Sequence, residues 1–450
     1  MAERFIIIGA DAAGMSAATQ IRRLKPGAEI TAYERGRTVS YAQCGLPYWI
    51  GGIVSEAEML VARTVEQFKT HYDIDVKIRH EVVAIDAKQK TVTVRNLNED
   101  REETVGYDKV LIATGARAVM PPWDGRELRG VFPLKNMDDA HRIKQYLAEE
   151  DIRNVVVIGG GYIGLEMAEA FERLGKTITV IDLAPQLALT FDPDMAALAE
   201  EALKRHGIDV VLETEVRRLV GEGGRVRAVE TNKGTFAAEL VLVAVGVVPN
   251  NELAITVGAE LGPKGAIRVN DKMETSIADV YAAGDCATQY HRIKGQDDFI
   301  PLGTHANKQG RIAGTNMGGG EAHFAGVVGS AIMKVLDIAM ARTGLSSREA
   351  EALGIPYETV SIRSRSRARY YPEAKALSIK MLYRTDDRRL LGAQIVGEDG
   401  VDKRIDVLAT ALYHEMTIDD LEKLDLSYAP PFNSVWDPIQ QAATVAKKQL

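Results

Sequence analysis

The chain has 450 residues, of which 46% are hydrophobic and 26% are charged, a balance typical of a globular protein of about three domains. A net charge of −8 gives no general attraction to nucleic acid or to a membrane, and two cysteines are too few for a disulfide framework or a zinc site, so we expect no metal. The first residues lead directly into a strand pattern without a leader or membrane span, which predicts a cytoplasmic protein.

The first motif is a glycine turn between a strand and a helix. Residues 4–8 form an apolar strand pattern, and the Ala-rich helix after the turn runs to about Leu24. This order places helix amides against a pyrophosphate, although Asp11 takes the place of the usual middle glycine. A second strand pattern ends at Glu34, 20 residues after Gly14, where a carboxylate can accept ribose hydroxyls. The predicted cofactor contacts are Gly9, Asp11, Ala12, Ala13, Gly14, Glu34 and Arg35.

A cysteine follows this unit, within the segment 40–52. Polar Ser40 and Gln43 precede Cys44, and glycines and a proline surround it. A thiol just after a flavin-type site can accept electrons from the flavin and pass them to a disulfide or another oxidised sulfur. The alternative is a small buried packing residue. We predict that Cys44 is redox-active.

The next segment returns the chain to the first sheet. Residues 82–85 and 91–95 predict a hairpin, and an apolar strand beginning near Tyr107 ends in a turn of small residues. Small residues let the chain pass close to a cofactor, and the pair Pro121-Pro122 marks a linker. Candidate cofactor contacts here are Val83, Ala113, Thr114 and Gly115.

A second glycine turn has all three glycines. The strand pattern 154–158 leads into it, a helix is expected over 165–174, and the strand 177–181 ends at Asp182. Asp182 is expected to bind a ribose 2′-hydroxyl, and no Arg or Lys stands in the next four residues to bind a 2′-phosphate, which favours NADH over NADPH. The predicted contacts are Gly159, Gly161, Tyr162, Ile163, Gly164, Glu166 and Asp182.

Two later strand patterns close the nucleotide units. The strand 240–246, together with residues 247–250, is expected to return the chain to the first domain, and the strand before Asp285 presents that acid to a ribityl hydroxyl. Cys286, in an apolar setting, is expected to pack. Candidate contacts here are Gly246, Gly284, Asp285 and Ala306.

From about Ala325 a third domain is expected, with no glycine turn. This domain contains four arginines at alternate positions, which a strand would place on one face. Such a face is either a solvated strand surface that discourages edge pairing or a basic surface for a phosphate-bearing substrate. A turn-rich segment around Tyr428 follows. The arginines are Arg363, Arg365, Arg367 and Arg369.

The order of these motifs resembles the flavoprotein disulfide reductase superfamily over essentially the whole chain. Members with two redox cysteines carry the second five residues after the first, whereas Trp49 stands there in this chain. The chain therefore resembles the single-cysteine branch, and most closely the coenzyme A-disulfide reductases. The resemblance implies an α/β fold with two Rossmann-like dinucleotide-binding domains, for FAD (1–116 and 251–322) and NAD(P)H (117–250), and a C-terminal α+β dimerisation domain (323–450) of a homodimer.

The resemblance also implies roles for individual residues. Electrons would pass from NADH, or possibly NADPH, through FAD and Cys44 to coenzyme A disulfide. Ser40 and Gln43 would contact substrate, with Gln43 replacing the family's Asn. The implied roles of the others are cover of the flavin by Tyr162, catalysis in the partner's active site by Tyr428 and by Tyr370 or Tyr371, and binding of a coenzyme A phosphate by Arg22 or Arg23.

Three other functions use the same motifs. Polysulfide or persulfide could replace the coenzyme A disulfide. NADH oxidases and peroxidases use a similar cysteine as a sulfenic acid, but place a His in the first glycine turn, where this chain has Ala12. An NADH sensor or an electron-transfer reductase acting on a protein partner needs no thiol at Cys44.

Overall fold

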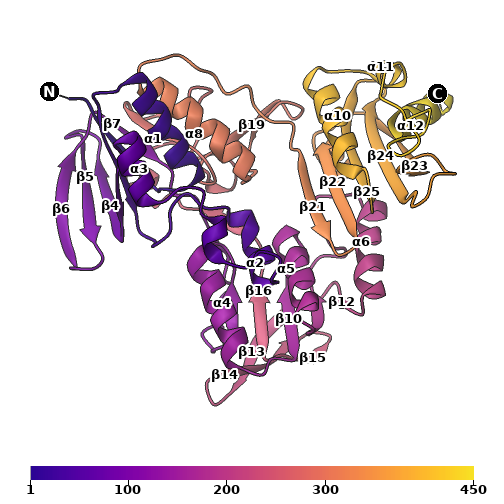
Figure 1. The fold of residues 1–450 in the computed structure, drawn as a ribbon, viewed down its shortest axis with the longest axis horizontal. Helices are drawn as coiled ribbons and strands as arrows, with labels where there is room; N and C mark the ends of the chain where they lie inside the picture. The colour runs from indigo at the N-terminus through magenta and orange to yellow at the C-terminus, as the bar shows by residue number, and fades with distance from the viewer. Residues whose placement is uncertain (1, 450) are drawn as a thin grey trace.

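The computed structural model describes residues 2–449 and contains three regions built on separate five-stranded sheets. In Figure 1 the first sheet region, in indigo, purple and orange, lies on the left, the second lies below the centre, and the C-terminal sheet region lies on the right. The predicted α/β class is confirmed, with antiparallel sheet confined mainly to small hairpins and to the C-terminal region. No helix within the described residues has the length and apolar character to cross a membrane.

The first sheet region is a parallel sheet built from two separate parts of the chain. Four of its strands lie within residues 4–112, and the fifth lies at 280–282. The apolar strand β1 lies at the centre and pairs with β2 and β7. Helices α1 and α8 pack against each other on this sheet (Figure 1). In sheet order the strands are β18 (Val280–Ala282), β7 (Lys109–Ile112), β1 (Arg4–Ile8), β2 (Glu29–Glu34) and β3 (Asp75–Ile78); the helices are α1 (Ala12–Leu24), α3 (Val65–Tyr72), α7 (Glu252–Thr256) and α8 (Gly303–Met317).

A small antiparallel sheet lies beside this region, at the far left of Figure 1. The predicted hairpin is confirmed as β4 (His80–Asp86) and β5 (Thr91–Asn96). A third strand, β6 (Arg101–Gly106), was not predicted from the sequence, because its exposed polar residues show no alternation with apolar ones. A further hairpin joins β19 (Gln289–His291) to β20 (Gln296–Asp298).

The second sheet region repeats the parallel plan. Its central strand β10 is buried along nearly its whole length, as expected for a strand covered on both faces. Helix α5 begins at Tyr162, three residues before the predicted start. In sheet order the strands are β12 (Asp209–Val211), β11 (Thr177–Ile181), β10 (Asn154–Ile158), β16 (Leu240–Val243) and β9 (Val131–Pro133); an antiparallel sheet contains β13 (Val216–Glu222), β14 (Arg225–Thr231) and β15 (Gly234–Ala237), and the helices are α4 (Met137–Glu149), α5 (Tyr162–Arg173) and α6 (Pro193–Arg205).

The return of the chain to the first domain was predicted for residues 240–250, and it is made by the last part of that range. Strand β16 is buried along its whole length and pairs with β10 and β9, so it belongs to the second sheet. The return is made by β17 (Val247–Pro249), which pairs antiparallel with β8 (Ala116–Ala118). The apolar run of β16 was correctly read as a strand, but its partners are set by packing that the sequence does not show.

The C-terminal sheet region is antiparallel, and helices cover it. The apolar faces of α10 and α12 pack with β24 and β25 in one core. In sheet order the strands are β21 (Ala331–Val335), β22 (Ile338–Gly344), β25 (Leu390–Gly397), β24 (Ala376–Arg384) and β23 (Tyr357–Arg365); the helices are α9 (Ser347–Ala352), α10 (Val401–Tyr413), α11 (Ile418–Glu422) and α12 (Pro438–Lys448).

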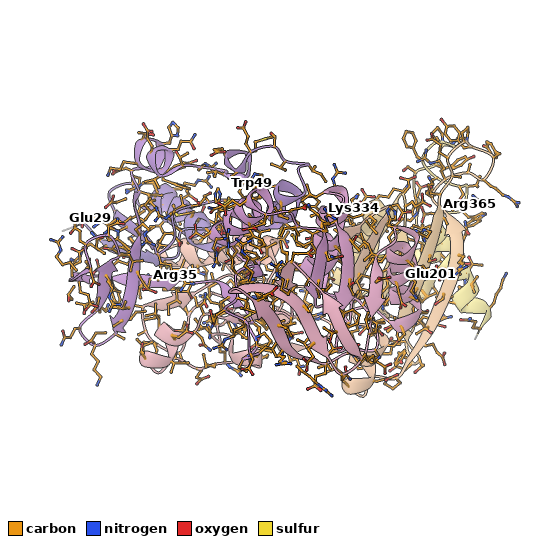
Figure 2. All side chains as sticks on the ribbon, turned by 90° about the horizontal axis from the view of Figure 1, so that it is seen from below. Glu29, Arg35, Trp49, Glu201, Lys334 and Arg365 are labelled. Atoms are coloured by element: carbon orange, nitrogen blue, oxygen red, sulfur yellow. The ribbon has the colours of Figure 1, made fainter. Side chains whose placement is uncertain are left out.

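The four alternating arginines do not share one strand face. Strand β23 ends at Arg365, and beyond it the chain turns, so the strand period no longer applies. Arg363 and Arg365 are exposed, and Figure 2 shows Arg365 at the C-terminal end of the molecule. Arg367 instead forms an ion pair with Asp399 at 2.5 Å.

Candidate active site

Cys44 lies where the first and second sheet regions meet. It occupies a single 3₁₀ turn (Gln43–Gly45) that leads into the short helix α2 (Leu46–Ile50), and Figure 1 shows α2 between the two regions. Trp49, on α2, lies in the middle of the molecule in Figure 2. The Cys44 residue is exposed, whereas Cys286 is buried, with its sulfur 3.4 Å from the carbonyl oxygens of Ile112 and Ala283. Of the two thiols, only that of Cys44 is open to a substrate.

The segment before Cys44 is held by the first glycine turn. The Ser40 amide donates to the Ala10 carbonyl at 2.9 Å, and the Tyr41 amide donates to Asp11 Oδ1 at 3.0 Å. Gln43 Nε2 donates to Asp11 Oδ2 at 2.8 Å. The cysteine is thus tied to the turn predicted to bind a nucleotide.

Lys135 is a site residue that the sequence analysis missed. It lies between β9 and α4, yet its ammonium donates to Gln43 Oε1 and to Asp285 Oδ2, both at 2.9 Å. The Lys135 and Asp285 side chains are largely buried. The capping box of Asn136 and Asp139 predicts the start of α4. No local pattern, however, indicates that the preceding lysine reaches another sheet region.

Charges around Cys44 act on its thiol in opposite directions. Partial burial against the surrounding groups raises the pKa of the Cys44 thiol, and the carboxylates of Glu166 and Asp285 raise it further, whereas the Lys135 ammonium lowers it. Burial, together with the nearby Glu169 carboxylate, raises the pKa of Glu166 to about 7. Glu169 itself is paired with Lys334 and accepts from the Leu336 amide at 2.9 Å.

The first glycine turn fits a dinucleotide. Glu34 Oε2 accepts from the Ala10 amide at 3.0 Å, so the acid lies beside the turn as predicted. No side chain caps the N-terminus of α1, which leaves its amides available to a phosphate. A Cβ on Gly14 would lie 1.9 Å from the Gly9 carbonyl oxygen, so the close approach of strand and helix requires glycine there.

The second glycine turn has the same construction. Asp182 Oδ2 accepts from the Gly160 amide at 2.6 Å, and a Cβ on Gly164 would lie 1.9 Å from the Gly159 carbonyl oxygen. The N-terminus of α5 is likewise without a side-chain cap. The helices at both turns therefore keep their first amides free for a ligand.

Tyr162 is the first residue of α5 and is half-buried. Its hydroxyl accepts from Thr190 Oγ1 at 3.4 Å, and burial raises the pKa of Tyr162. Its neighbour Ile163 packs at the edge of the second core.

Other predicted contacts gather where strands of the two sheet regions cross. Thr114 Oγ1 donates to the Asn250 carbonyl at 2.7 Å, and the Asn250 amide donates to the Gly115 carbonyl at 3.0 Å. A Cβ on Gly284 would lie 2.9 Å from that of Ala13 and 3.5 Å from that of Ala306, so these three residues meet. Gly246 accepts from the Val119 amide at 2.9 Å, and Ala113 donates its amide to the Ile8 carbonyl at 2.8 Å and lies against Gly9. Two predicted contacts lie elsewhere: Val83 is the extra residue at the β4 bulge, and Arg35 lies 4.0 Å from Glu81.

The structure brings Tyr370 and Tyr428 together. Their hydroxyl oxygens are 3.4 Å apart, and both side chains are exposed, Tyr370 by 76%. Tyr371 is half-buried, and its amide donates to Ala368. Figure 1 places β23 and α11, which precede the Tyr370 and Tyr428 segments, at the end of the molecule away from α2, the helix that follows Cys44.

One buried guanidinium holds both tyrosine segments. Arg404, on α10, is 1% exposed and donates to the Ser366 carbonyl at 2.9 Å and to Asn433 Oδ1 at 3.0 Å. It also pairs with Asp437 at 3.0 Å, and Asp437 caps α12. Ser366 begins the loop of Tyr370, and Asn433 ends the loop of Tyr428.

Only one of the two candidate phosphate-binding arginines is free. The Arg22 guanidinium donates to the carbonyl oxygens of Pro26, Asp73 and Tyr72 at 2.5, 2.7 and 2.8 Å. Arg23 is exposed on the same helix. Arg22 therefore supports the helix end, and Arg23 is the better candidate for an anion.

Three relatives match nearly the full chain. An NAD(P)H coenzyme A polysulfide/persulfide reductase from Pyrococcus horikoshii is 40% identical over 448 residues, 99% of each chain. An NADH oxidase from Methanocaldococcus jannaschii is 36% identical over 448 residues, and a coenzyme A disulfide reductase from Staphylococcus haemolyticus is 33% identical over 451 residues, each again covering 99% of both chains.

The fold agrees with a solved structure. An NAD-dependent persulfide reductase from A. fulgidus is 41% identical and superposes with a TM-score of 0.96, over 99% of this chain and 83% of that one. The family model for pyridine nucleotide-disulphide oxidoreductases matches residues 3–310, and the model for the dimerisation domain of the same family matches residues 330–438. The chain therefore belongs to the pyridine nucleotide-disulphide oxidoreductases, and it is an enzyme of the disulfide reductase type that the motif order indicated.

Proposed function

We propose that this enzyme uses NADH and FAD to reduce coenzyme A disulfide through Cys44, in a homodimer. The observation that carries the proposal is the exposed Cys44, whose preceding segment is held by the first nucleotide turn through Tyr41 and by the second sheet region through the contact of Lys135 with Gln43. The reductases named among its relatives act on disulfide, polysulfide or persulfide sulfur, and the last two are the nearest alternative substrates.

The chemistry begins with the Cys44 thiolate. It attacks one sulfur of coenzyme A disulfide, so that an S–S bond to Cys44 forms and one coenzyme A thiolate leaves. Bound FAD would supply the transfer of an electron pair from nicotinamide to this mixed disulfide. Reduction returns the Cys44 thiolate and frees the second coenzyme A, so one NADH and one proton convert one disulfide to two thiols. The Lys135 ammonium favours the thiolate form of Cys44 both in the attack on the disulfide and in the reduction of the mixed disulfide.

The leaving thiolates need a proton. The hydroxyls of Tyr370 and Tyr428 lie together on the exposed side of the C-terminal sheet region, remote from Cys44 of the same chain. In a homodimer built on the dimerisation domain, this pair would reach the partner's Cys44 and donate there. Exposed Phe432 and Trp436, near Tyr428, give the same surface the apolar character of a subunit contact.

We assign the preference between NADH and NADPH to Asp182 at the second glycine turn. Asp182 has one oxygen on the Gly160 amide and the other on the Ala184 amide, so the carboxylate is fixed where a ribose 2′-hydroxyl would donate to it. A 2′-phosphate would meet this fixed negative charge. We therefore propose NADH as the preferred donor over NADPH.

The test is anaerobic NADH oxidation by the FAD-loaded enzyme, with coenzyme A disulfide or polysulfide added in separate assays. We expect turnover only after addition of a sulfur substrate, and more with the preferred one. Cys44→Ser should abolish that turnover and retain FAD, while Cys286→Ala, at the buried thiol, serves as the matched control and keeps turnover. Full activity of Cys44→Ser would exclude the proposed route.

The NADH oxidase named among the relatives supports a second candidate, reduction of oxygen or peroxide through a Cys44 sulfenic acid. Ala12, in place of a histidine, leaves this turn without an acid–base side chain at that position. If NADH is consumed only when oxygen is admitted, and coenzyme A disulfide and polysulfide have no effect, the oxidase assignment replaces the reductase.

A further inference from the structure

Two unusual residues of this sequence contact each other. Asp11 occupies the place of a glycine in the first turn, and Gln43 immediately precedes Cys44. Asp is among the residues preferred for capping its own helix, yet the Asp11 carboxylate does not cap α1. It turns instead to the segment before Cys44, accepting from the Tyr41 amide at 3.0 Å and from Gln43 Nε2 at 2.8 Å. The two residues therefore form one unit.

This unit has a fixed direction. The Lys135 ammonium can only donate, and it donates to Gln43 Oε1 at 2.9 Å. The amide of Gln43 must then present its nitrogen to Asp11, where only an acceptor fits. Although burial raises the pKa of Asp11 to about 6, its carboxylate is ionised at neutral pH and accepts both bonds. Lysine, glutamine and aspartate thus form a chain of donors and acceptors that cannot be reversed.

The chain explains why these two side chains occur together. An asparagine at position 43 would be one methylene shorter and could not reach Asp11 and Lys135 from the same backbone position. A glycine at position 11 would leave Gln43 Nε2 without its acceptor. The Gln43 amide would then be held only by Lys135, whose other acceptor, Asp285, disfavours the Cys44 thiolate.

We propose that Asp11 and Gln43 are a positioning pair, which fixes both the segment before Cys44 and the ammonium of Lys135 in the arrangement that supports the Cys44 thiolate. The pair acts on the sulfur through Lys135. The proposal rests on the assignment of Cys44 as the reactive thiol, but not on which disulfide the enzyme reduces.

The test exchanges the two functional groups. Asp11→Asn leaves one acceptor oxygen for two donors, so its amide nitrogen meets either Gln43 Nε2 or the Tyr41 amide, and Gln43→Glu places two carboxylates together. In the double variant the amide at position 11 donates to the carboxylate at position 43, which still accepts from Lys135. The measurement is the rate of Cys44 alkylation by iodoacetamide against pH in the FAD-loaded enzyme, read from the Cys44 peptide so that Cys286 does not contribute.

We expect each single variant to alkylate Cys44 about threefold to tenfold more slowly at neutral pH, with its pH midpoint raised. The double variant should react faster than Gln43→Glu alone and return to within about twofold of the wild-type rate. A double variant slower than either single variant would show independent effects and overturn the pairing.

A second variant covers the case in which a changed Asp11 does not fold. Gln43→Met keeps the side-chain length, removes both amide atoms and leaves no new buried charge beside Asp11. It should slow alkylation and raise the pH midpoint at unchanged melting temperature, and a wild-type pH profile would contradict the proposal. Because alkylation requires neither NADH nor a disulfide, this outcome is separate from the substrate tests.

Discussion

Glu166 and Lys135 bring opposite charges to the same sulfur. Both residues belong to the second sheet region, Glu166 on α5 and Lys135 just before α4. Cys44 lies in the segment that follows strand β2 of the first sheet region. Glu166 raises the pKa of the Cys44 thiol, and its own pKa is raised by burial to about 7. The influence of Glu166 on the thiol must therefore change across the neutral pH range.

Removing the Glu166 charge should make Cys44 more reactive in alkaline solution. Above pH 7 Glu166 is ionised and disfavours the thiolate, while below pH 7 it is protonated and neutral. We expect Glu166→Gln to alkylate Cys44 about twofold to fivefold faster than wild type at about pH 8, with the difference closing by about pH 6. The measurement is the iodoacetamide rate across this range.

Glu172→Gln is the matched control, since it makes the same charge change on the same helix at a residue that lies beside His206. It should leave the alkylation profile unchanged. A Glu166→Gln rate equal to wild type at pH 8, or a difference that persists undiminished at pH 6, would show that Glu166 does not act on the thiol through its charge.

Sequence patterns predicted the two glycine turns and the acids beside them, since Glu34 and Asp182 each lie at a fixed spacing from a turn and accept from its amides. They did not predict Lys135, whose contacts with Gln43 and Asp285 join residues 92 and 150 positions apart. They left Tyr370 and Tyr371 undistinguished, because only the folded loop brings one of the two hydroxyls to Tyr428.

At the scale of elements, α10 organises the exposed end of the C-terminal sheet region. Arg404 joins the loop after β23 to the loop before α12, and Lys403 donates to the Phe432 carbonyl at 2.7 Å. The position of the tyrosine pair therefore depends on a helix that carries neither tyrosine. Burial lowers the pKa of Arg404, and the partner Asp437 opposes that effect.

Loss of the Arg404 guanidinium should be costly. Arg404→Met leaves the buried Asp437 carboxylate without its partner, and we expect a loss of about 3–5 kcal/mol in the free energy of unfolding. The measurement is urea unfolding followed by tryptophan fluorescence, because Trp436 adjoins Asp437.

The double variant Arg404→Met/Asp437→Asn separates the buried charge from the lost contacts. The amide can still accept from the Ile439 amide and cap α12, and no unpaired charge remains. It should recover at least about half of the loss. A double variant as unstable as the single one would assign the loss to the loops themselves.

Secondary structure was predictable where one local pattern dominates, as in β1, β10 and β11, whose bounds agree with the sequence patterns. It failed where structure depends on distant partners. Strand β6 is polar and is held by β5, and the chain leaves β23 at Arg365 although the alternation of arginines continues.

At the scale of the whole molecule, the proposed active site is divided between chains. The elements that precede the tyrosine pair, β23 and α11, and the helix α2 that follows Cys44 lie at separate places in one chain (Figure 1). A symmetric dimer would supply each cysteine with the tyrosines of the other chain. Assembly would then be a condition of catalysis.

Mixed dimers test this division. Cys44→Ser dimers lack the thiol, and Tyr370→Phe/Tyr428→Phe dimers, which lack both hydroxyls, should turn over at least about tenfold more slowly than wild type. When the two variants are mixed at equal amounts and exchange subunits at random, half of the dimers contain both chains, each with one complete site. We expect about a quarter of wild-type turnover.

If the tyrosines served the cysteine of their own chain, no mixed dimer would hold a complete site. Turnover would then stay at the average of the two parent variants. Mixing without time for subunit exchange is the control, and it should show no gain.

The contact of Lys135 with Gln43 and Asp285 also ties the sulfur to the relative position of two parts of the molecule. The lysine moves with one sheet region, while its two acceptors move with the other. Any hinge motion between them withdraws a positive charge from the thiol as it opens and restores it as it closes. The pKa of the Cys44 thiol would therefore be lower when the two sheet regions are close together and higher when they separate. The thiolate, which is the nucleophile, would form most readily in the closed arrangement.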